Sequence, residues 1–412
     1  MPGERMLDAL EIELEDIDWT AWADEPFPLY RRLRDEAPVY WDERNQTFVL
    51  TRHDDVYGIL RDHQRFSSVP LDILEGRQPP TSEIRQADEP RHRFVRNIVA
   101  PLFNPAAMRR REEIIREIVR EIVDAAQGPD VIEISTVIAT PLPARVALGL
   151  IGLPQSRHER FNQLMDERLE IILTRGSRAE SSPADLERLA RVGAEMWEIV
   201  VPLIEERRAK PEDDAITRIL ETQDEVGKAE LSDDLFLNML LELVTGGFET
   251  TQHLIEMLMS HLADHPELWE RLREDRTLVP KAIEEMLRWR SPVQALGRRT
   301  TEDFVLRDVT IPANSWVTVV YGSANRDERE FDHPDAYDVD RELRRHVAFS
   351  AGIHYCPGAP VSRAETRLLF EELLDRYRTV ERAGPSLPSP NPMPGKPGKI
   401  LGWGQVPVRF EQ

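Results

Sequence analysis

The chain has one cysteine, and it lies in a glycine-framed loop whose chemistry suits metal ligation. Cys356 comes four residues after Gly352 and two before Gly358. Glycines let a loop bend tightly and let another group approach the backbone closely. A helical pattern begins at Ala359, so we expect the sulfur near a helix N-terminus, where the dipole and free N–H groups favour a thiolate. Such a thiolate can bind iron; the plain alternative is a buried, inert cysteine.

An acid and an alcohol form a second candidate, in the middle of the longest predicted helix, residues 232–263. Ser232 is the predicted N-cap, and apolar residues lie almost all round this helix, which is typical of a helix inside a protein. The central residues are Gly246-Gly247-Phe248-Glu249-Thr250-Thr251. Two glycines there cost about 1 kcal/mol each relative to alanine, and a buried acid or alcohol is costly unless paired. Such broken local rules indicate a functional site, whereas small residues that ease a helix crossing are the alternative.

Two charged pairs complete the set of candidates. His92 and Arg96 are four residues apart, so on a helix they share one face. Together they suit a carboxylate ligand, although a solvated basic face has the same pattern. Glu285 and Arg288 are three residues apart on a predicted helix, which alone indicates no more than a surface ion pair.

Composition excludes several classes of function. The chain has 412 residues, of which 41% are hydrophobic and 31% charged, and a formal net charge of −22. This charge argues against binding of nucleic acid or an anionic membrane. A single cysteine excludes an intrachain disulfide and a Cys-rich zinc site. We see no signal core and no stretch long enough to span a bilayer, so we expect a cytoplasmic protein.

Periodicity predicts a mainly helical chain with a few strands. Length alone favours two or three domains but also suits one large helical domain. Residues 66–89 are predicted to form a long irregular loop. Its scattered apolar residues favour a functional loop that covers another part of the protein. The predicted helices are 26–37, 54–62, 109–126, 141–153, 161–173, 184–208, 232–263 and 278–290, with a short one opening at 211–214 and a loop at 222–229. The predicted strands are 39–41, 47–51, 304–306, 309–311 and 316–321, and a returning hairpin follows the proline-rich stretch 384–398.

The motifs, taken in order, resemble those of the cytochrome P450 family. Phe349-x-x-Gly352-x-x-x-Cys356-x-Gly358 is similar to the haem-binding loop, residues 246–251 to the oxygen-binding motif, and Glu285-x-x-Arg288 to the Glu-x-x-Arg motif. The resemblance spans essentially the whole chain. It implies one haem domain over residues 1–412, mainly α with small β-sheets, with the haem between the long central helix and the Cys loop with its following helix.

The resemblance also implies roles for individual residues. Cys356 would ligate the iron of haem b, Thr250 would hydrogen-bond the iron-bound oxygen, and Glu249 would help to relay protons. Arg341 would join Glu285 and Arg288 in a buried cluster that positions the Cys loop, and Arg298 or its neighbour Arg299 would bind a propionate. The full set of expected cofactor-binding residues is His92, Arg96, Gly246, Arg298, Phe349, His354, Cys356 and Gly358.

Two positions depart from the family pattern. Ser350 and Ala351 stand where a glycine is often found after the phenylalanine. Pro357, directly after the cysteine, has no N–H. A backbone donor to the sulfur is therefore absent at that position, which changes how the thiolate is tuned.

The function implied by the resemblance is oxygen insertion from O2 into a small organic substrate. No flavin or nucleotide motif follows the haem region, so a ferredoxin and a ferredoxin reductase are the expected electron donors. We expect the ferredoxin to dock on arginines near the His92–Arg96 pair and the Cys loop. An aliphatic pocket favours a largely apolar substrate, such as a terpenoid or substituted aromatic that is hydroxylated or O-demethylated. Arg77 or Arg85 on the long loop could instead hold a carboxylate. The expected pocket residues are Leu74, Val244, Phe248, Val293, Gln294, Leu296 and Leu401, with the neighbouring stretches 69–74 and 169–173.

Two other classes stay open at this point. One is a haem–thiolate protein that binds ligand without turnover or uses peroxide directly, although the Glu249–Thr250 pair argues against it. The other is a hydrolase with a cysteine nucleophile, which needs a histidine base oriented by Asn or Asp. His354 is close in sequence, but the glycine-framed loop suits iron better. A visible absorption spectrum separates these classes.

Overall fold

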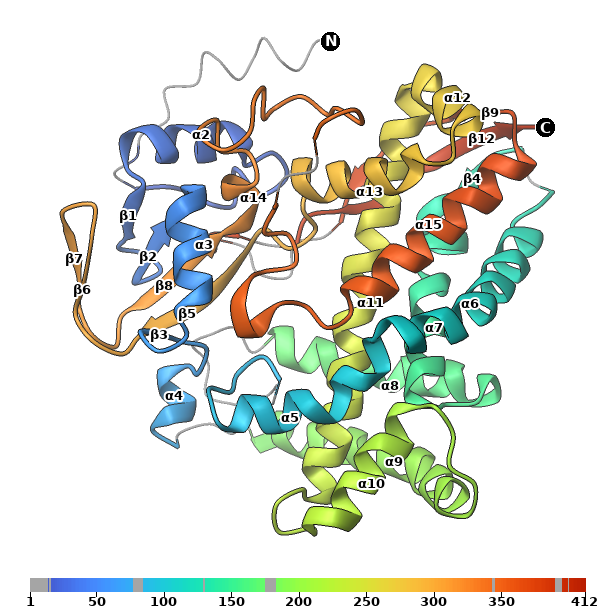
Figure 1. The fold of residues 1–412 in the computed structure, drawn as a ribbon, viewed down its shortest axis with the longest axis horizontal. Helices are drawn as coiled ribbons and strands as arrows, with labels where there is room; N and C mark the ends of the chain where they lie inside the picture. The colour runs from blue at the N-terminus through green and yellow to red at the C-terminus, as the bar shows by residue number, and fades with distance from the viewer. Residues whose placement is uncertain are drawn as a thin grey trace. The chain divides into compact units, whose positions relative to one another are not determined.

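Helices make up most of the computed structural model, and small β-sheets accompany them (Figure 1). The structure describes residues 14, 16–76, 84–128, 130–174, 183–342, 345–389, 395–398 and 400–412. The predicted mainly α fold is therefore confirmed. Contacts group the chain into two units, the first made of Met1–Pro79, Glu256–Cys356 and Pro385–Val406, the second of Pro80–Ile255, Pro357–Gly384 and Pro407–Gln412.

A five-stranded sheet organises the first unit. Its order is β1-β2-β8-β5-β3, in which β2 and β8 run parallel and the other neighbours antiparallel. Phe48, Leu50, Val317 and Val319 from β2 and β8 form part of a buried core, as expected for branched and aromatic residues on strands. The strands are β1 (Val39–Asp42), β2 (Thr47–Leu50), β3 (Phe66–Ser67), β5 (Ala295–Thr300) and β8 (Trp316–Val320).

Helices and two strand pairs complete the first unit. α14 contacts both α2 and α3. β6 pairs with β7, and β10 pairs antiparallel with β11, which agrees with the predicted returning chain near the C-terminus. These elements are α2 (Phe27–Glu36), α3 (His53–Arg61), α4 (Leu71–Leu74), α12 (Pro266–Glu274), α13 (Leu278–Trp289), α14 (Tyr321–Ala324), η4 (Gly352–His354), β6 (Phe304–Leu306), β7 (Val309–Ile311), β10 (Leu387–Pro388) and β11 (Trp403–Gln405).

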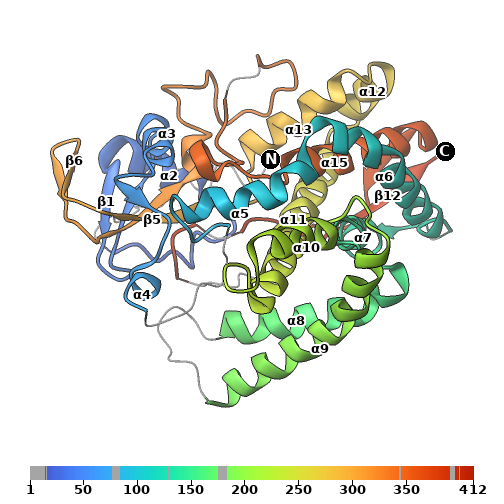
Figure 2. The ribbon, with the colours of Figure 1, turned by 60° about the horizontal axis from the view of Figure 1, so that its bottom comes forward.

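The second unit is a group of packed helices. α15 packs on α6, and α8 lies beside α9 (Figure 2). Polar side chains cap several of the helices: the Asn104 side chain accepts from Ala107 N–H at 2.8 Å, and Asp214 accepts from Thr217 N–H at 2.8 Å. The helices are α5 (Arg91–Val99), η1 (Ala100–Phe103), α6 (Pro105–Ala125), η2 (Ser135–Ala139), α7 (Pro141–Ile151), η3 (Gln155–Arg157), α8 (His158–Thr174), α9 (Pro183–Ala209), α10 (Ala215–Val226) and α15 (Ala359–Arg376).

The long helix α11 (Asp233–Asp264) begins in the second unit, and its last residues belong to the first. Its predicted N-cap is confirmed, because Ser232 Oγ accepts from Leu235 N–H at 3.2 Å. A small sheet with the order β4-β12-β9 also belongs to the second unit, and the sequence analysis did not predict it. These strands are β4 (Ile132–Glu133), β9 (Thr379–Arg382) and β12 (Pro407–Glu411).

Two local predictions were wrong. Residues 66–89 are not irregular throughout, because β3 and α4 form within them. The predicted loop at 222–229 is helical as far as Val226, since buried Gln223 donates to Leu231 O at 2.9 Å and ties the helix end to the next segment. The long helix α11 ends at Asp264, close to the predicted end, and Pro266 then opens α12, where its missing N–H has no partner to lose. Two arginines with expected roles lie outside the described residues: Arg77, on the long loop, and Arg344, near the Cys loop. Residues 175–182, between α8 and α9, also lie outside them.

Among the described residues, no single helix has both the length and the hydropathy to cross a membrane. One bent pair, Ser135–Ile151 with Gln155–Met165, meets those two criteria only when the helices are taken together across a bend of 115°.

Candidate functional site

The Cys356 loop of the first unit is shaped by its own backbone. Cys356 N–H donates to Phe349 O at 2.9 Å, and Ser350 N–H donates to Val347 O at 2.8 Å. Gly352 has φ +71°, and a Cβ there would lie 2.4 Å from Leu60 O. Glycine is therefore required at this position both by conformation and by close approach. The cysteine itself is partly exposed, so its sulfur is not an inert core group.

Tyr321 contacts this loop and lies near both a cation, Arg298, and the cysteine. Its hydroxyl donates to Ser350 Oγ at 3.1 Å. Burial raises the pKa of Tyr321, the nearby Arg298 guanidinium opposes the rise, and Cys356 adds to it. Arg298, 4% exposed on β5, also donates to Gly297 O at 2.8 Å. The first unit thus places a cation, a phenol and a thiol within one neighbourhood.

Arg298 and Arg299 point to opposite faces of β5, as successive strand residues must. Arg299 donates from Nε to Val69 O at 3.0 Å and from Nη1 to Asn314 Oδ1 at 2.7 Å. These contacts hold Arg299 in the protein framework, away from the Tyr321 neighbourhood. Of the two arginines, Arg298 is therefore the one placed with the Cys loop.

Glu285, Arg288 and Arg341 form a buried ion cluster in the first unit. Arg288 donates through Nε and Nη2 to the two Glu285 carboxylate oxygens, at 2.8 and 2.7 Å. Arg341 Nε donates to Glu285 Oε1 at 3.0 Å, and so does Asp338 N–H. Arg288 also reaches the carbonyl oxygens of Asn325, Pro334 and Ala336. The cluster ties α13 to the segment 325–341 that precedes the Cys loop, an arrangement expected from the sequence.

The turn of α11 at Gly246 is exposed, whereas residues of the helix on either side of it are buried. Leu243 and Val244 before the centre, and Leu254 and Ile255 after it, are buried, whereas Gly246 is exposed. A Cβ on Gly246 would meet nothing within 4 Å, and one on Gly247 would make only an ordinary contact of 3.7 Å with Ala147. Close helix packing therefore does not require these glycines, which argues against the helix-crossing alternative.

Three polar side chains follow Gly246 on α11, and the last of them, Thr251, is buried. Thr250 Oγ1 donates to Gly246 O at 3.1 Å. Glu249, with a side chain 43% exposed, lies 3.8 Å from Nε2 of the buried His253. The expectation of a deeply buried acid is therefore wrong, and Glu249 carries no large desolvation cost. Thr251 instead donates to Ser362 Oγ on α15 at 3.0 Å.

His92 and Arg96 share one face of α5 in the second unit. His92 is 2% exposed, and its Nδ1 lies 3.7 Å from Glu89 Oε1. Burial is the main cause that lowers the pKa of His92, and the Arg96 charge lowers it further. Burial and the Arg96 charge therefore both disfavour the protonated imidazole, and Arg96 itself is half-buried.

The expected pocket residues divide into exposed and core positions. In the first unit Leu74 is 57% exposed, and Val293 and Leu296 are half-buried. Gln294 has no exposed surface and donates to Ser291 O at 2.6 Å, so it is a core residue and not an open polar contact. Leu401 is likewise in the core of the first unit.

In the second unit Val244 is buried and Phe248 is half-buried. Arg85 and Ile84 donate their backbone N–H groups to the Glu242 carboxylate, at 3.1 and 3.0 Å. Of the stretch 169–173, the structure describes one side chain, Ile171, which is fully buried. Phe248 is thus the expected pocket residue of this unit that keeps accessible surface.

Each unit by itself carries donor groups that suit an iron porphyrin. The first offers a partly exposed thiol, the half-buried His354 on the same loop, and Arg298, which lies near Tyr321 as the thiol does. The second offers the exposed turn of α11 at Gly246, and an arginine and a buried imidazole on one face of α5. Thiolate suits the iron, and the cations suit the two carboxylates of the porphyrin.

Comparison with known proteins gives the same assignment. A family model described as Cytochrome P450 matches residues 29–401. Putative cytochrome P450 YjiB of Bacillus subtilis is 33% identical over 356 residues, which cover 86% of this chain and 88% of that protein. Erythromycin C-12 hydroxylase of Saccharopolyspora erythraea is 34% identical over 355 residues, covering 85% and 87%. The crystal structure of CYP109E1 from Bacillus megaterium in complex with corticosterone has a TM-score of 0.80 at 30% identity, covering 94% and 99%. The chain therefore belongs to the cytochrome P450 family, whose members are haem–iron monooxygenases.

Proposed function

We propose that this cytochrome P450 binds haem b and inserts one oxygen atom from O2 into a small to medium, largely apolar molecule, with electrons from a ferredoxin system. The observation that carries the proposal is the partly exposed Cys356, whose loop contacts Tyr321 and lies in the same neighbourhood as Arg298 on β5. Cys356 would hold the iron. Arg298 and His354, together with His92 and Arg96, would hold the carboxylates. When bound, the haem supplies the oxidising chemistry, because thiolate donation favours O–O cleavage.

The residues of α11 would deliver protons. Glu249 is exposed enough to exchange protons with water, and the structure gives it a histidine neighbour. The Thr250 hydroxyl donates to Gly246 O, and its oxygen can still accept a hydrogen bond. We infer that protons pass from water to the Glu249 carboxylate and onward to Thr250 Oγ1. Thr251 is held by Ser362 and would have no part in this relay.

The substrate class follows from the side chains that keep accessible surface. Leu74, Phe248, Val293 and Leu296 are all apolar, and the one neutral polar side chain expected among them, Gln294, is in the core. An apolar wall orients a ligand mainly by shape. A charged or sugar-like substrate would lose hydration with little in return. Of the relatives named above, one is an erythromycin hydroxylase, and the other was crystallised with corticosterone, a largely apolar steroid.

Ligand-induced spin-state titration of the purified protein tests this substrate class. Terpenoids, substituted aromatics and steroids should give saturable shifts, and product analysis should then show hydroxylation or O-demethylation. A matched pair of variants, Leu296→Asn and Leu387→Asn, separates pocket from surface effects, because Leu387 is 46% exposed on β10. We expect Leu296→Asn to weaken apolar ligands and Leu387→Asn to leave them unchanged. Complete shifts only with polyhydroxylated compounds would overturn the proposal.

A further inference from the structure

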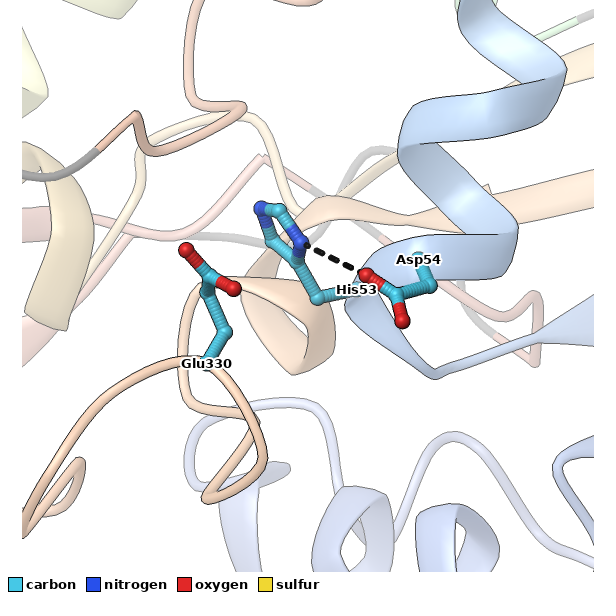
Figure 3. Close-up of side chains that lie close together, drawn as sticks. All are labelled: His53, Asp54 and Glu330. Atoms are coloured by element: carbon cyan, nitrogen blue, oxygen red, sulfur yellow. Dashed lines mark ion pairs between the residues drawn. The ribbon is translucent and has the colours of Figure 1, made fainter.

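Three side chains with metal-binding atoms meet at the start of α3, in the first unit. His53 and Asp54 are the first residues of α3, and Glu330 lies in the loop that follows α14. Figure 3 shows the Asp54 and Glu330 carboxylates on either side of the His53 ring. The backbone holds this arrangement, because His53 N–H donates to Oδ2 of the buried Asp327 at 2.8 Å, in the same loop as Glu330.

The His53 ring is fixed, and its contacts define its tautomer. The side chain is buried, with 6% of the residue exposed. The ring stacks on Tyr57 at 5.8 Å between centroids and meets the edge of Phe331 at the same separation. Nε2 lies 3.3 Å from Arg345 O, and a carbonyl oxygen can only accept, so Nε2 carries the hydrogen. Nδ1 of the neutral ring therefore has a free lone pair, the form that binds a metal ion.

Nδ1 forms no hydrogen bond with any described residue, although the ring is buried. Its nearest carboxylate atom, Asp54 Oδ1, is 3.8 Å away, which is too long for a hydrogen bond. A lone pair facing carboxylates is unfavourable unless a cation joins them. The ring contacts and the Arg345 carbonyl thus explain where the His53 ring lies. They do not explain why its buried Nδ1 forms no hydrogen bond with a described residue.

The spacing of the three side chains suits one bound ion. One ligand atom from each lies within 4.8 Å of the other two. A zinc-like ion binds such atoms at about 2.0–2.2 Å, so two of its ligands lie roughly 3–4 Å apart. The 3.8 Å between His53 and Asp54 falls in this range. The Asp54 side chain is 88% exposed and can rotate to close the remaining gap.

The charges of the neighbourhood favour a cation. The site brings two carboxylates and an imidazole together, which are oxygen and nitrogen donors of the kind that a divalent transition-metal ion binds. Arg329, one residue before Glu330, is already paired with Asp35, Asp327 and Glu328. It is therefore held by other carboxylates and does not fill the site.

We propose that His53, Asp54 and Glu330 bind a divalent transition-metal ion of the Zn²⁺ class, with water completing its coordination. One imidazole nitrogen with carboxylate oxygens suits Zn²⁺, Co²⁺ or Mn²⁺, whereas Ca²⁺ and Mg²⁺ prefer oxygen ligands alone. The ion ties the start of α3 to the loop after α14. It is separate from the haem–thiolate chemistry, so this inference does not depend on the proposed function.

Isothermal titration calorimetry of the chelator-washed, haem-loaded protein with ZnCl2 tests the site. The haem-loaded form keeps Cys356 engaged. We expect one saturable Zn²⁺ per chain, no saturable Ca²⁺, and a rise in the thermal midpoint when Zn²⁺ is present. Asp54→Asn and Glu330→Gln should each weaken Zn²⁺ binding about 10-fold or more. Glu302→Gln removes an exposed carboxylate elsewhere on the same unit and should leave binding unchanged.

His53→Gln removes the nitrogen ligand and should abolish saturable Zn²⁺ binding. If this change in a buried residue prevents folding, the Asp54→Asn and Glu330→Gln variants still test the site. Absence of saturable Zn²⁺ binding in the wild-type protein would overturn the proposal. So would an unchanged affinity in the Asp54→Asn and Glu330→Gln variants, because the ion would then lie elsewhere. Equal binding of Ca²⁺ and Zn²⁺ would contradict the role of His53.

Discussion

Thr250 and Thr251 are neighbours in sequence, but their hydroxyl groups have different partners. Thr250 bonds within the open turn of α11, at Gly246 O, whereas Thr251 bonds to Ser362 on α15. This difference assigns the proposed proton delivery to the first residue and a packing role to the second. The sequence motif alone does not separate the two, because both positions carry the same side chain.

Thr250→Ala should therefore keep haem and substrate binding but divert electrons into peroxide. Proton transfer by a positioned group contributes about 10²-fold or more to a rate, so product formed per electron should fall steeply. The measurement is product, peroxide and NAD(P)H consumption in a reconstituted system. Thr251→Ala is the control: it should lower the free energy of unfolding by about 1 kcal/mol, through its lost hydrogen bond, and leave coupling intact. If the two variants exchange these behaviours, the assignment is wrong.

The Cys loop is the element where the structure explains a departure from the family pattern. Ser350 has φ +65°, a left-handed conformation that costs a residue with a Cβ about 1–2 kcal/mol, which glycine avoids. Ser350 accepts a hydrogen bond from the buried Tyr321 hydroxyl, worth about 1 kcal/mol. The serine thus offsets most of its backbone strain with a bond that glycine cannot make.

Two substitutions at this position test the balance. Ser350→Gly relieves the strain and loses the bond, so its free energy of unfolding should stay within about 1 kcal/mol of wild type. Ser350→Ala loses the bond and keeps the strain, so it should be the least stable of the three proteins. Thermal unfolding, monitored by circular dichroism, gives the order. An alanine variant as stable as the wild type would mean that the Tyr321 bond contributes nothing.

Strong local signals at element scale predicted the long helices correctly, and weak ones failed. The Ser232 cap and the apolar pattern after it defined α11. The end of α10 could not be predicted, because it depends on the burial of Gln223 and on its hydrogen bond to Leu231 O, which local propensity does not reveal. Gln294 was expected to face a ligand because a polar residue stood among apolar ones; in the structure it satisfies Ser291 O inside the core. The pairing of Glu285 with two arginines could be predicted only from the resemblance to a family.

At the scale of the whole molecule, the charge distribution bears on electron transfer. The chain carries a net charge of −22, and we expected exposed arginines to attract an acidic ferredoxin. Several of these arginines are already paired: Arg110 and Arg111 with Asp213, and Arg367 with Glu112 and Glu371. Arg109 is exposed, and within the described part of the chain no ion pair holds it. It is therefore the clearest single cation for docking.

Arg109→Glu should slow reduction by a ferredoxin, and the wild-type rate should fall as salt rises, because charge steering is screened over a Debye length of ~10 Å at 0.1 M ionic strength. Stopped-flow reduction at several salt concentrations measures both effects. Arg273→Glu makes the same change of charge at an exposed position on α12 and serves as the control. Rates that are insensitive to salt and equal in the two variants would refute docking through this charge.

The central claim is that Cys356 ligates haem iron as a thiolate, and the most direct test is the absorption spectrum of the reduced protein under carbon monoxide. We predict the strongly red-shifted Soret band of a haem with an axial thiolate in the wild-type protein, and its loss in Cys356→Ala. A colourless wild-type protein, or an unshifted band in intact protein, would contradict the account.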